Sequence, residues 1–271
     1  MLFRSGQIFF EGEDITNCSR KKLGELRKNM QIIFQDPYSS LDPRMSVREI
    51  IEEPLVISKL YPESAKRQAR VDELMGLVGL SQRLANSYPH ELDGGRRQRI
   101  GVARALSLNP KFIVCDEPVS ALDVSVQAQI LNLMQDLQEQ LGLTYIFITH
   151  DLSVVKHISN DICVMYLGVL VENCNTKELF KNPMHPYTKA LLSAIPVPDL
   201  SYKRNREIIM GELTSPVNPK PGCRFAPRCR YAKGDCFETT PTLRDVGENH
   251  FVACHHIETI NELGNAVQGK K

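Results

Sequence analysis

The sequence predicts an α/β protein whose core is a mostly parallel β-sheet. Three short apolar runs are typical of buried strands: MQIIFQ (30–35), KFIVCDE (111–117) and TYIFITH (144–150). Amphipathic segments lie between them, and strands that alternate with helices favour parallel pairing. From about Pro196, prolines, turn residues and cysteines replace this periodicity, so we expect a small extension after the core.

The remaining elements follow from local patterns. QIFFEGEDI predicts a hairpin that turns at Gly12, and SRKKLGELRKN predicts a short helix capped by Ser19. Further helices are expected at about 47–58, 64–78 and within 91–106. The rest of the core is predicted to be a long helix capped by Asp123 or Ser125, a helix in DLSVVKHIS, a strand pair in DICVMYLGVLVEN and a final helix in PYTKALLSAI.

Bulk composition excludes several classes of protein. The 271 residues carry a formal net charge of +1, so no global field favours nucleic acid or an anionic membrane. The sequence has no apolar run long enough to span a bilayer, and MLFRSGQIFFEGED lacks the apolar stretch of a signal peptide. A cytoplasmic setting is therefore expected.

Polar side chains are found where three of the predicted strands end. Asp116 and Glu117 close KFIVCDE, His150 closes TYIFITH, and Gln35 closes MQIIFQ. Ligands of open α/β sheets bind beyond the carboxyl ends of the strands, so these side chains are candidates for one site. An Asp for Mg²⁺, a Glu that polarises water and a His that contacts a phosphate suit phosphoryl hydrolysis. A lone Asp-Glu pair is usually just a strand that exits into solvent. Here TYIFITHD follows after one helix, which places His150 at the end of what is expected to be a neighbouring strand and favours a site.

Several motifs in a fixed order resemble the ATPase subunit of an ATP-binding-cassette (ABC) importer. MQIIFQDPYSSLDPRMSV resembles the Q-loop region, ELDGGRRQR the signature motif, FIVCDEP the Walker B strand, SALD the D-loop and ITHD the switch histidine. The resemblance covers about residues 6–256. PGCRFAPRC, GDC and a late CHH resemble the C-terminal extension of the second ATPase of oligopeptide or dipeptide importers.

The resemblance implies a P-loop NTPase-like (RecA-like) parallel sheet core with an inserted helical subdomain and a small Cys-rich extension. By this resemblance the ATPase core is expected in residues 1–35 and 93–196, the helical subdomain in 36–92 and the extension in 197–271. The expected partners are a second ATPase subunit, two membrane permease subunits and, indirectly, a peptide-binding protein, with no nucleic acid. Such a subunit would lie at the cytoplasmic face of the membrane, and the Tyr38–Leu80 segment would contact the permeases.

The resemblance also implies ATP and Mg²⁺ as cofactors and a role for each matching residue. Glu117 would polarise the attacking water and His150 would contact the γ-phosphate. Asp116 would act on Mg²⁺, and Gln35, also at the Mg²⁺ site, would couple the metal to the membrane subunits. Asp123 would report across the subunit dimer. The signature positions that would face ATP held by the partner subunit are occupied by Asp93, Gly94, Gly95 and Arg96.

The adjacent glycines suit that position, because glycine lets a phosphate approach the backbone at the start of a helix. The arginines behind them are expected to be solvated or paired.

The chain departs from the family pattern at two places. The family's Ser-Gly-Gly-Gln is replaced by Asp93 to Arg96, and an ionised carboxylate repels phosphate and donates no hydrogen bond, although Arg96 brings an offsetting cation. The phosphate loop G-x-x-x-x-G-K-S/T is absent from the 271 residues; by resemblance it belongs a few tens of residues before Gln7. A truncated or misassigned start would explain this, and so would a subunit that has lost its own site.

Three functions follow from these features. The leading one is the ATP-hydrolysing subunit of a peptide importer, with nickel as an alternative substrate. The second is a non-hydrolysing partner that completes a composite ATP site or acts as an assembly scaffold. The third is a cassette ATPase outside transport, which the cysteine-rich tail disfavours.

Four late cysteines are spaced C-x5-C-x6-C-x17-C, unlike the close pairs of zinc ribbons. Spacing alone leaves free thiols, metal ligation and disulfides open. The resemblance implies a 4Fe–4S cluster, with zinc as the alternative, held by Cys223, Cys229, Cys236 and Cys254. His255 and His256 follow Cys254 and are interpreted as flanking rather than ligating.

Overall fold

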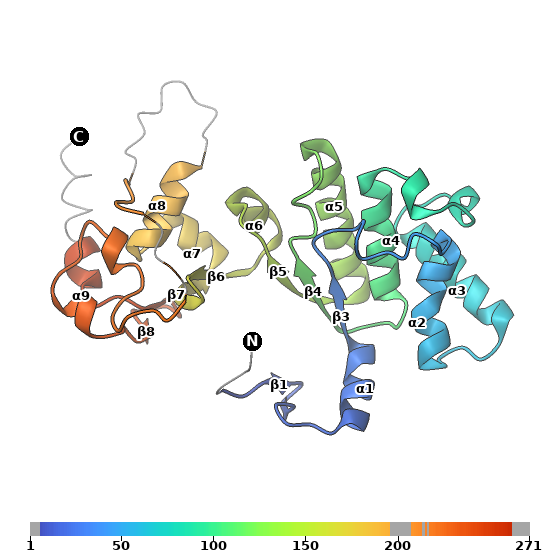
Figure 1. The fold of residues 1–271 in the computed structure, drawn as a ribbon, viewed down its shortest axis with the longest axis horizontal. Coiled ribbons are helices and arrows are strands. Elements are labelled where there is room, and N and C mark those ends of the chain that lie inside the picture. Colours follow the sequence, from blue (N-terminus) through green and yellow to red (C-terminus); the bar gives the residue numbers. More distant parts are fainter. Residues whose placement is uncertain (1–5, 196–206, 213–214, 216, 262–271) are drawn as a thin grey trace. The chain divides into compact units, whose positions relative to one another are not determined.

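The computed structural model describes residues 6–195, 207–212, 215 and 217–261. The chain divides into two compact units, Met1–His150 and Asp151–Lys271, whose elements are drawn in Figure 1. Among the described residues, no helix combines the length and the apolar character needed to cross a bilayer.

The first unit contains the predicted parallel sheet. Its strands β3 (Met30–Ile33), β4 (Phe112–Asp116) and β5 (Thr144–Ile148) lie in the order β3-β4-β5, and both neighbouring pairs are parallel. The prediction that the strands before Glu117 and His150 are neighbours is therefore confirmed. The predicted N-terminal hairpin is formed by β1 (Phe9–Phe10) and β2 (Glu13–Asp14).

The predicted helices of the first unit are present, and all but one begin at a polar side chain that caps the helix. They are α1 (Arg20–Asn29), α2 (Val47–Ser58), α3 (Ser64–Leu77), α4 (Gly94–Leu106) and α5 (Val124–Leu141). Ser19 caps α1 as predicted, and Ser46 forms a reciprocal capping box with Glu49 at α2. At α5 the cap is Asp123 and not Ser125. Short 3₁₀ turns at Gln82–Leu84 and Pro89–Glu91 connect α3 to α4.

The two faces of this sheet differ in burial. On one face Ile33, Ile113 and Cys115 are at most 3% exposed, and α4 contacts β3. On the other face Ile146 is 52% exposed and Ile32, its counterpart two strands away, is 40% exposed. Parallel sheets normally bury both faces. Within the described residues, this sheet therefore has one covered face and one face that exposes isoleucine.

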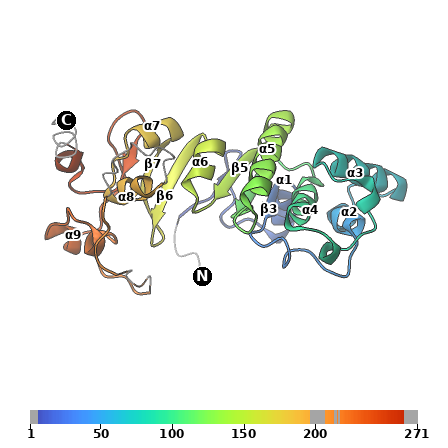
Figure 2. The same cartoon turned by 90° about the horizontal axis from the view of Figure 1, so that it is seen from above.

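The second unit is built on an antiparallel sheet in the order β6-β7-β9-β8. The predicted strand pair forms β6 (Asp161–Tyr166) and β7 (Val169–Asn175), and β9 (Phe251–Val252) and β8 (Arg244–Asp245) extend it. The helices are α6 (Leu152–Ile158), α7 (Thr176–Lys181), α8 (Pro186–Ala194) and α9 (Asp235–Glu238), with a 3₁₀ turn at Ala226–Arg228. Helix α7 was not anticipated from the sequence. Figure 2 shows the same elements from above.

The cysteine-rich segment packs against the residues that precede it in the chain. Phe225 lies in one core cluster with Tyr166 and Val171, and β9 pairs with β7. The predicted boundary between residues 196 and 197 lies outside the described residues. In the structure, the extension shares a core with the β6–β7 hairpin rather than forming a separate body.

Candidate functional site

Glu117 is held between two of the residues that the sequence placed at strand ends. Gln35 Nε2 donates to Glu117 Oε2 at 2.8 Å, and His150 Nδ1 lies 3.1 Å from Glu117 Oε1. Gln35 follows β3, Glu117 follows β4 and His150 follows β5, so parallel pairing brings all three to one edge of the sheet. The Glu117 carboxylate, with 23% of its side chain exposed, is thereby oriented by a donor at each oxygen.

The backbone at Glu117 adopts a conformation that is uncommon for a residue with a side chain. Its φ is 44°, in the left-handed region. Two contacts hold this turn: the Glu117 amide donates to Ile148 O at 3.0 Å, and Ser120 Oγ donates to Glu117 O at 3.1 Å. Such backbone strain is concentrated at functional sites, where the surrounding structure imposes it.

Asp116, the last residue of β4, pairs in register with Ile148. Alternation along β4 places Asp116 with Val114 on the sheet face opposite the buried Ile113 and Cys115. This carboxylate is thus at the same sheet edge as Glu117 but on the exposed face. It has the chemistry for Mg²⁺, which prefers carboxylate oxygens.

The signature segment begins α4, and Asp93 is its cap. Asp93 Oδ1 accepts from the Arg96 backbone amide at 2.8 Å, and Arg96 Nη1 lies 3.3 Å from Asp93 Oδ2. The carboxylate expected to repel phosphate is therefore engaged by its own helix and paired with a cation. The next arginines are also paired: Arg97 donates to Pro89 O and Arg99 donates to Val78 O.

The glycine pair has a packing role that the sequence did not reveal. A Cβ on Gly95 would lie 2.5 Å from Val126 Cγ1, and one on Gly94 would lie 3.1 Å from Leu122 Cδ2. Val126 is in the first turn of α5, which Asp123 caps by accepting from the Val126 amide at 3.0 Å. The start of α4 thus approaches α5 so closely that Gly95 leaves no room for a side chain.

The segment expected to contact membrane subunits exposes apolar side chains at the end of α2. Val56 is 52% exposed and Ile57 is 74% exposed. Tyr38 is 57% exposed, and its ring lies under the Arg97 guanidinium at 5.0 Å. Because most other apolar residues of α2 are buried, this exposure marks one end of the helix and not the whole helix.

A second site forms around the four late cysteines, which are far apart in sequence. They line one cavity of about 20 Å³ together with His185, Phe225 and His256, and none of them forms a disulfide. Gly222 makes this possible: its φ is 103°, and a Cβ there would lie 2.7 Å from Cys236 O. The next residue, Cys223, donates its amide to that same oxygen at 2.8 Å.

Burial makes three of these thiols weaker acids than a free cysteine in the absence of a cation. It raises the pKa of Cys254 to about 11, with the neighbouring cysteines adding to the effect, and it also raises the pKa values of Cys223 and Cys229. Thiolate is the metal-binding form, and a bound cation reverses this shift by stabilising the charge. The donor types suit a thiolate-binding metal group, but among the described residues no three of the cysteine sulfurs all lie within 4.8 Å of one another.

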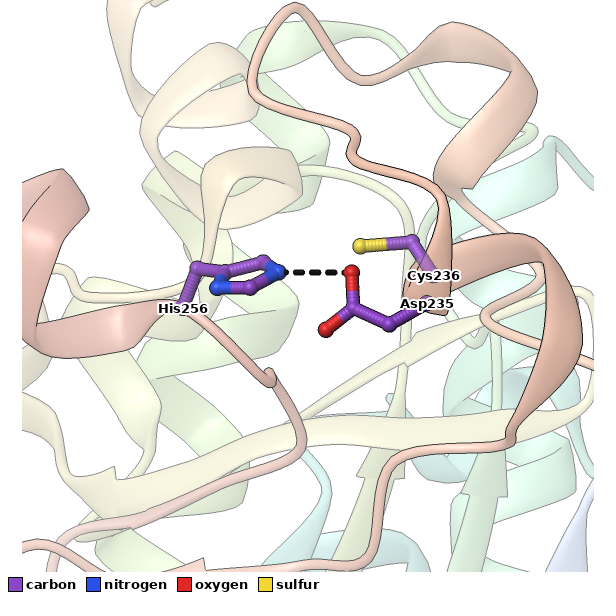
Figure 3. A group of neighbouring side chains, drawn as sticks. All are labelled: Asp235, Cys236 and His256. Atoms are coloured by element: carbon purple, nitrogen blue, oxygen red, sulfur yellow. Dashed lines mark hydrogen bonds and ion pairs between the residues drawn. The ribbon is translucent and has the colours of Figure 1, made fainter.

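His256 is closer to this site than its interpretation as a flanking residue suggested. His256 Nε2 donates to Asp235 Oδ1 at 2.9 Å, beside Cys236 (Figure 3). His255 Nε2 instead contacts Thr239 O at 2.9 Å.

The second unit also contains a buried ionisable network that the sequence does not predict. Glu172, in β7, is fully buried and accepts from the Met184 and His185 amides at 2.7 and 3.0 Å and from His250 Nε2 at 2.7 Å. Burial alone would raise the pKa of Glu172, but these hydrogen bonds outweigh it and lower the pKa. The one hint in the sequence was an acid inside an apolar strand.

Comparisons with known proteins identify the family to which the chain belongs. Residues 2–120 match the family described as ABC transporter, and residues 171–236 match the one described as oligopeptide/dipeptide transporter, C-terminal region. The oligopeptide transport ATP-binding protein AppF of Bacillus subtilis (strain 168) is 54% identical over 253 residues, which cover 92% of this chain and 77% of that protein. The chain belongs to the ABC transporter ATPases that carry this C-terminal region.

Other similar proteins support the same family. The oligopeptide transport ATP-binding protein OppF of Haemophilus influenzae (strain ATCC 51907 / DSM 11121 / KW20 / Rd) is 49% identical over 251 residues, covering 92% of this chain and 76% of that protein. Among solved structures, CbiO1 from Clostridium perfringens has a TM-score of 0.60 and 31% identity over 66% of this chain and 69% of its own. A dimeric ABC cassette in a post-hydrolysis state with ADP and Pi has a TM-score of 0.56 and 28% identity over 64% of this chain and 74% of its own.

Membership of this family implies ATP and Mg²⁺ as cofactors and ATP hydrolysis as the activity. The fold prediction is confirmed by the ABC ATPase neighbours and by the parallel sheet.

Proposed function

We propose that this ABC ATPase is the energy-coupling subunit of a peptide importer. The observation that carries the proposal is the Glu117 carboxylate, held between Gln35 at 2.8 Å and His150 at 3.1 Å at the carboxyl edge of a parallel sheet. A carboxylate oriented in this way is suited to polarise a water for attack on a phosphate. The substrate class rests on relatives whose names describe oligopeptide transport.

The roles of single residues are part of this proposal. Glu117 polarises the attacking water, His150 contacts the γ-phosphate, and Asp116 with Gln35 serves Mg²⁺. The second half of the composite site comes from the start of α4, namely Asp93, Gly94, Gly95 and Arg96, and Asp123 reports across the dimer from the cap of α5. We assign residues 1–35 and 93–196 to the ATPase core, 36–92 to the helical subdomain and 197–271 to the extension.

The proposed partners are a second ATPase subunit, two membrane permeases at the cytoplasmic face of the membrane, and indirectly a peptide-binding protein. The apolar end of α2, with Val56 and Ile57 exposed, supports a permease contact. A solved relative that is dimeric supports the pairing of ATPase subunits.

A second candidate is a subunit that does not hydrolyse ATP but completes a site on its partner. It is favoured by the signature, which reads Asp93-Gly94-Gly95-Arg96 where the family has Ser-Gly-Gly-Gln. In that case only the residues at the start of α4 would contact ATP, and the contacts around Glu117 would have no catalytic role.

One experiment separates the two. The assembled transporter is prepared with wild-type chain, with Glu117→Gln and, as a matched control, with the exposed Glu238→Gln. If this chain hydrolyses ATP, Glu117→Gln abolishes the ATPase activity that depends on it while nucleotide binding remains, and Glu238→Gln changes neither. Unchanged steady-state hydrolysis in Glu117→Gln removes Glu117 from its role and favours the second candidate.

We also propose that the four late cysteines hold an iron–sulfur cluster with a structural role. Four unbridged thiols that line one cavity support it, and thiolates are the usual ligands of such clusters. The cavity, about 20 Å³, has room for roughly one water or ion, so a four-iron cluster needs the side chains to move apart. Iron and sulfide analysis after anaerobic purification tests the proposal; stoichiometric zinc without iron would replace the cluster by a zinc site.

A further inference from the structure

The loop of residues 36–40 directly follows Gln35, whose side-chain amide donates to Glu117 Oε2 at 2.8 Å. Gln35 lies just beyond the end of β3, and the chain next enters a helix at Val47. A side chain on such an irregular segment keeps one orientation only if other contacts order the backbone that carries it. The contacts that hold this loop therefore decide how well Gln35 is placed on Glu117.

Two arginines of α4 contact this loop. The Arg97 guanidinium lies over the Tyr38 ring, with 5.0 Å between its Cζ and the ring centroid. Arg104 Nη1 donates to Ser40 O at 2.6 Å. The two arginines are seven residues apart, about two helical turns, so they project from the same face of α4. The helix that begins with the signature residues thus holds the loop at two points, beside the strand β3 from which the loop leaves (Figure 1).

The Arg97 side chain is itself fixed by the turn before the signature. Its Nε donates to Pro89 O at 2.7 Å, and its Nη2 donates to His90 O at 3.5 Å. Both carbonyls belong to the 3₁₀ turn Pro89–Glu91. The guanidinium forms these bonds through its edge, so its flat face can lie on an aromatic ring, a geometry that arginine favours over lysine.

The loop also has internal contacts that connect Tyr38 to Gln35. Asp36 Oδ1 accepts the Tyr38 amide at 2.8 Å, and Asp36 O accepts the Ser40 amide at 3.1 Å. The hydrogen bond from the Tyr38 amide lowers the pKa of Asp36, and the charge of Arg97 adds to this effect. Because Asp36 is the neighbour of Gln35 in the chain, a displacement of Tyr38 would also displace the backbone that carries Gln35.

We propose that Arg97 is a positioning residue for the ATPase site. By holding the Tyr38 ring it fixes the loop 36–40 and keeps the Gln35 amide on the Glu117 carboxylate. Its effect on hydrolysis is exerted through Gln35 and not by contact with the reacting groups. This role rests on the proposed hydrolytic function, and it adds a link between the signature helix and the residue that orients Glu117.

The first test measures the order of the loop in the purified 271-residue chain without nucleotide. Arg97→Gln is expected to speed amide hydrogen exchange in residues 36–40 roughly 2- to 10-fold, because the cation over the ring is lost. Tyr38→Leu should have the same effect, and since Tyr38 is 57% exposed this change leaves the core intact. Arg20→Gln, at the exposed start of α1, is the matched control and should not affect the loop. Exchange at the wild-type rate in either loop variant would overturn the inference.

The second test asks whether Arg97 acts through Gln35 in the assembled transporter. Arg97→Gln is expected to lower kcat for ATP hydrolysis roughly 3- to 10-fold. In a Gln35→Ala background the same change should alter kcat less than about twofold, because the side chain that Arg97 positions is gone. A merely structural role would lower the rate by the same factor in both backgrounds, and that result would overturn the inference.

Variants at Tyr38 decide the question if Gln35→Ala leaves too little hydrolysis to measure. Tyr38→Phe keeps the ring, so it should be faster than Tyr38→Leu by about the factor lost in Arg97→Gln. Equal rates for the two Tyr38 variants would overturn the inference. Glu117→Gln in the same preparations tests the proposed function separately. If it leaves hydrolysis unchanged, that function fails, and hydrogen exchange alone decides whether Arg97 holds the loop.

Discussion

Glu172 Oε1 lies 2.7 Å from His250 Nε2, and both side chains are shielded from solvent. Glu172 also accepts two backbone amides from the turn before α8, so one carboxylate joins β7, that turn and the segment that leads into β9. The residues are 78 positions apart in the chain. This contact therefore holds the cysteine-rich extension to the β6–β7 hairpin.

Glu172→Gln is expected to destabilise the second unit by about 3 kcal/mol. Glutamine replaces one carboxylate oxygen by an NH₂ group, so at least one of the three groups that donate to Glu172 loses its acceptor, and a buried donor left without a partner costs about 1–3 kcal/mol, more where a charged acceptor is lost. Urea denaturation followed by near-ultraviolet circular dichroism measures the change, with exposed Glu238→Gln as the matched control. Equal midpoints for the two variants would show that the pair contributes nothing to stability.

The free energy of unfolding of the second unit is expected to decrease in two steps as the pH falls. Burial lowers the pKa of His185 from 6.5 to about 4, so the folded state keeps His185 neutral while the unfolded chain takes up a proton below pH 6.5. Stability is thus fully present above pH 6.5 and is lost toward pH 4, by up to about 3 kcal/mol. Glu172, whose pKa is lowered from 4.5, adds a second loss as pH falls below that value.

His185→Asn is the variant that isolates the first step. His185 Nδ1 accepts the Tyr187 amide at the start of α8, and asparagine can replace that cap. Unfolding free energies measured from pH 7 to pH 4 should then be flatter than in the wild type. An unchanged slope would assign the loss to another group.

Gly222→Ala is expected to disrupt the cysteine site, at a cost of about 2 kcal/mol or more. The new Cβ would lie 2.7 Å from Cys236 O, in a backbone conformation that favours glycine. The metal content and the midpoint temperature of thermal unfolding should both fall. Gly234→Ala is the matched control, since its Cβ would meet nothing within 4 Å; similar metal contents in both variants would contradict the argument.

Gly95→Ala is expected to destabilise the first unit by about 1–3 kcal/mol through overpacking against Val126. Gly101→Ala, in the same helix, meets no atom within 4 Å and should stabilise by up to about 1 kcal/mol. The double variant Gly95→Ala/Val126→Ala should recover much of the loss, as measured by urea denaturation. Failure of Val126→Ala to rescue would assign the effect of Gly95 to another contact.

Restoring the family signature is expected to raise ATP hydrolysis. In a complex whose partner subunit carries an intact phosphate loop, Asp93→Ser/Arg96→Gln should raise the ATPase rate by about tenfold, because a hydroxyl donor replaces a carboxylate. Arg96→Gln alone should lower the rate, since Asp93 would lose the cation 3.3 Å away. Equal rates in all three proteins would mean that this site does not limit turnover, whereas an unchanged double variant with a slower Arg96→Gln would mean that Arg96 already compensates for Asp93.

Much of the first unit could be predicted from sequence because its determinants are local. The caps at Ser19 and Asp123 act within one helical turn, and the apolar runs that become β3, β4 and β5 are continuous. The grouping of Gln35, Glu117 and His150 was predictable too. Each follows a continuous apolar run, and parallel pairing of those strands brings their ends together. Helix α7 was missed because its 6 residues are too few to show a helical period.

The sequence by itself determined the family, the order of the elements and the chemical types at the ATPase site. The tertiary structure decided the contacts between segments that no periodicity connects: Glu172 with His250, Gly95 with Val126, and His256 with Asp235 beside Cys236. The physical reason is that side-chain patterns report which face of an element is buried, whereas these contacts depend on how separate elements pack. An acid in a strand, a glycine in a helix and a histidine after a cysteine acquire their roles only from the partner that packing supplies.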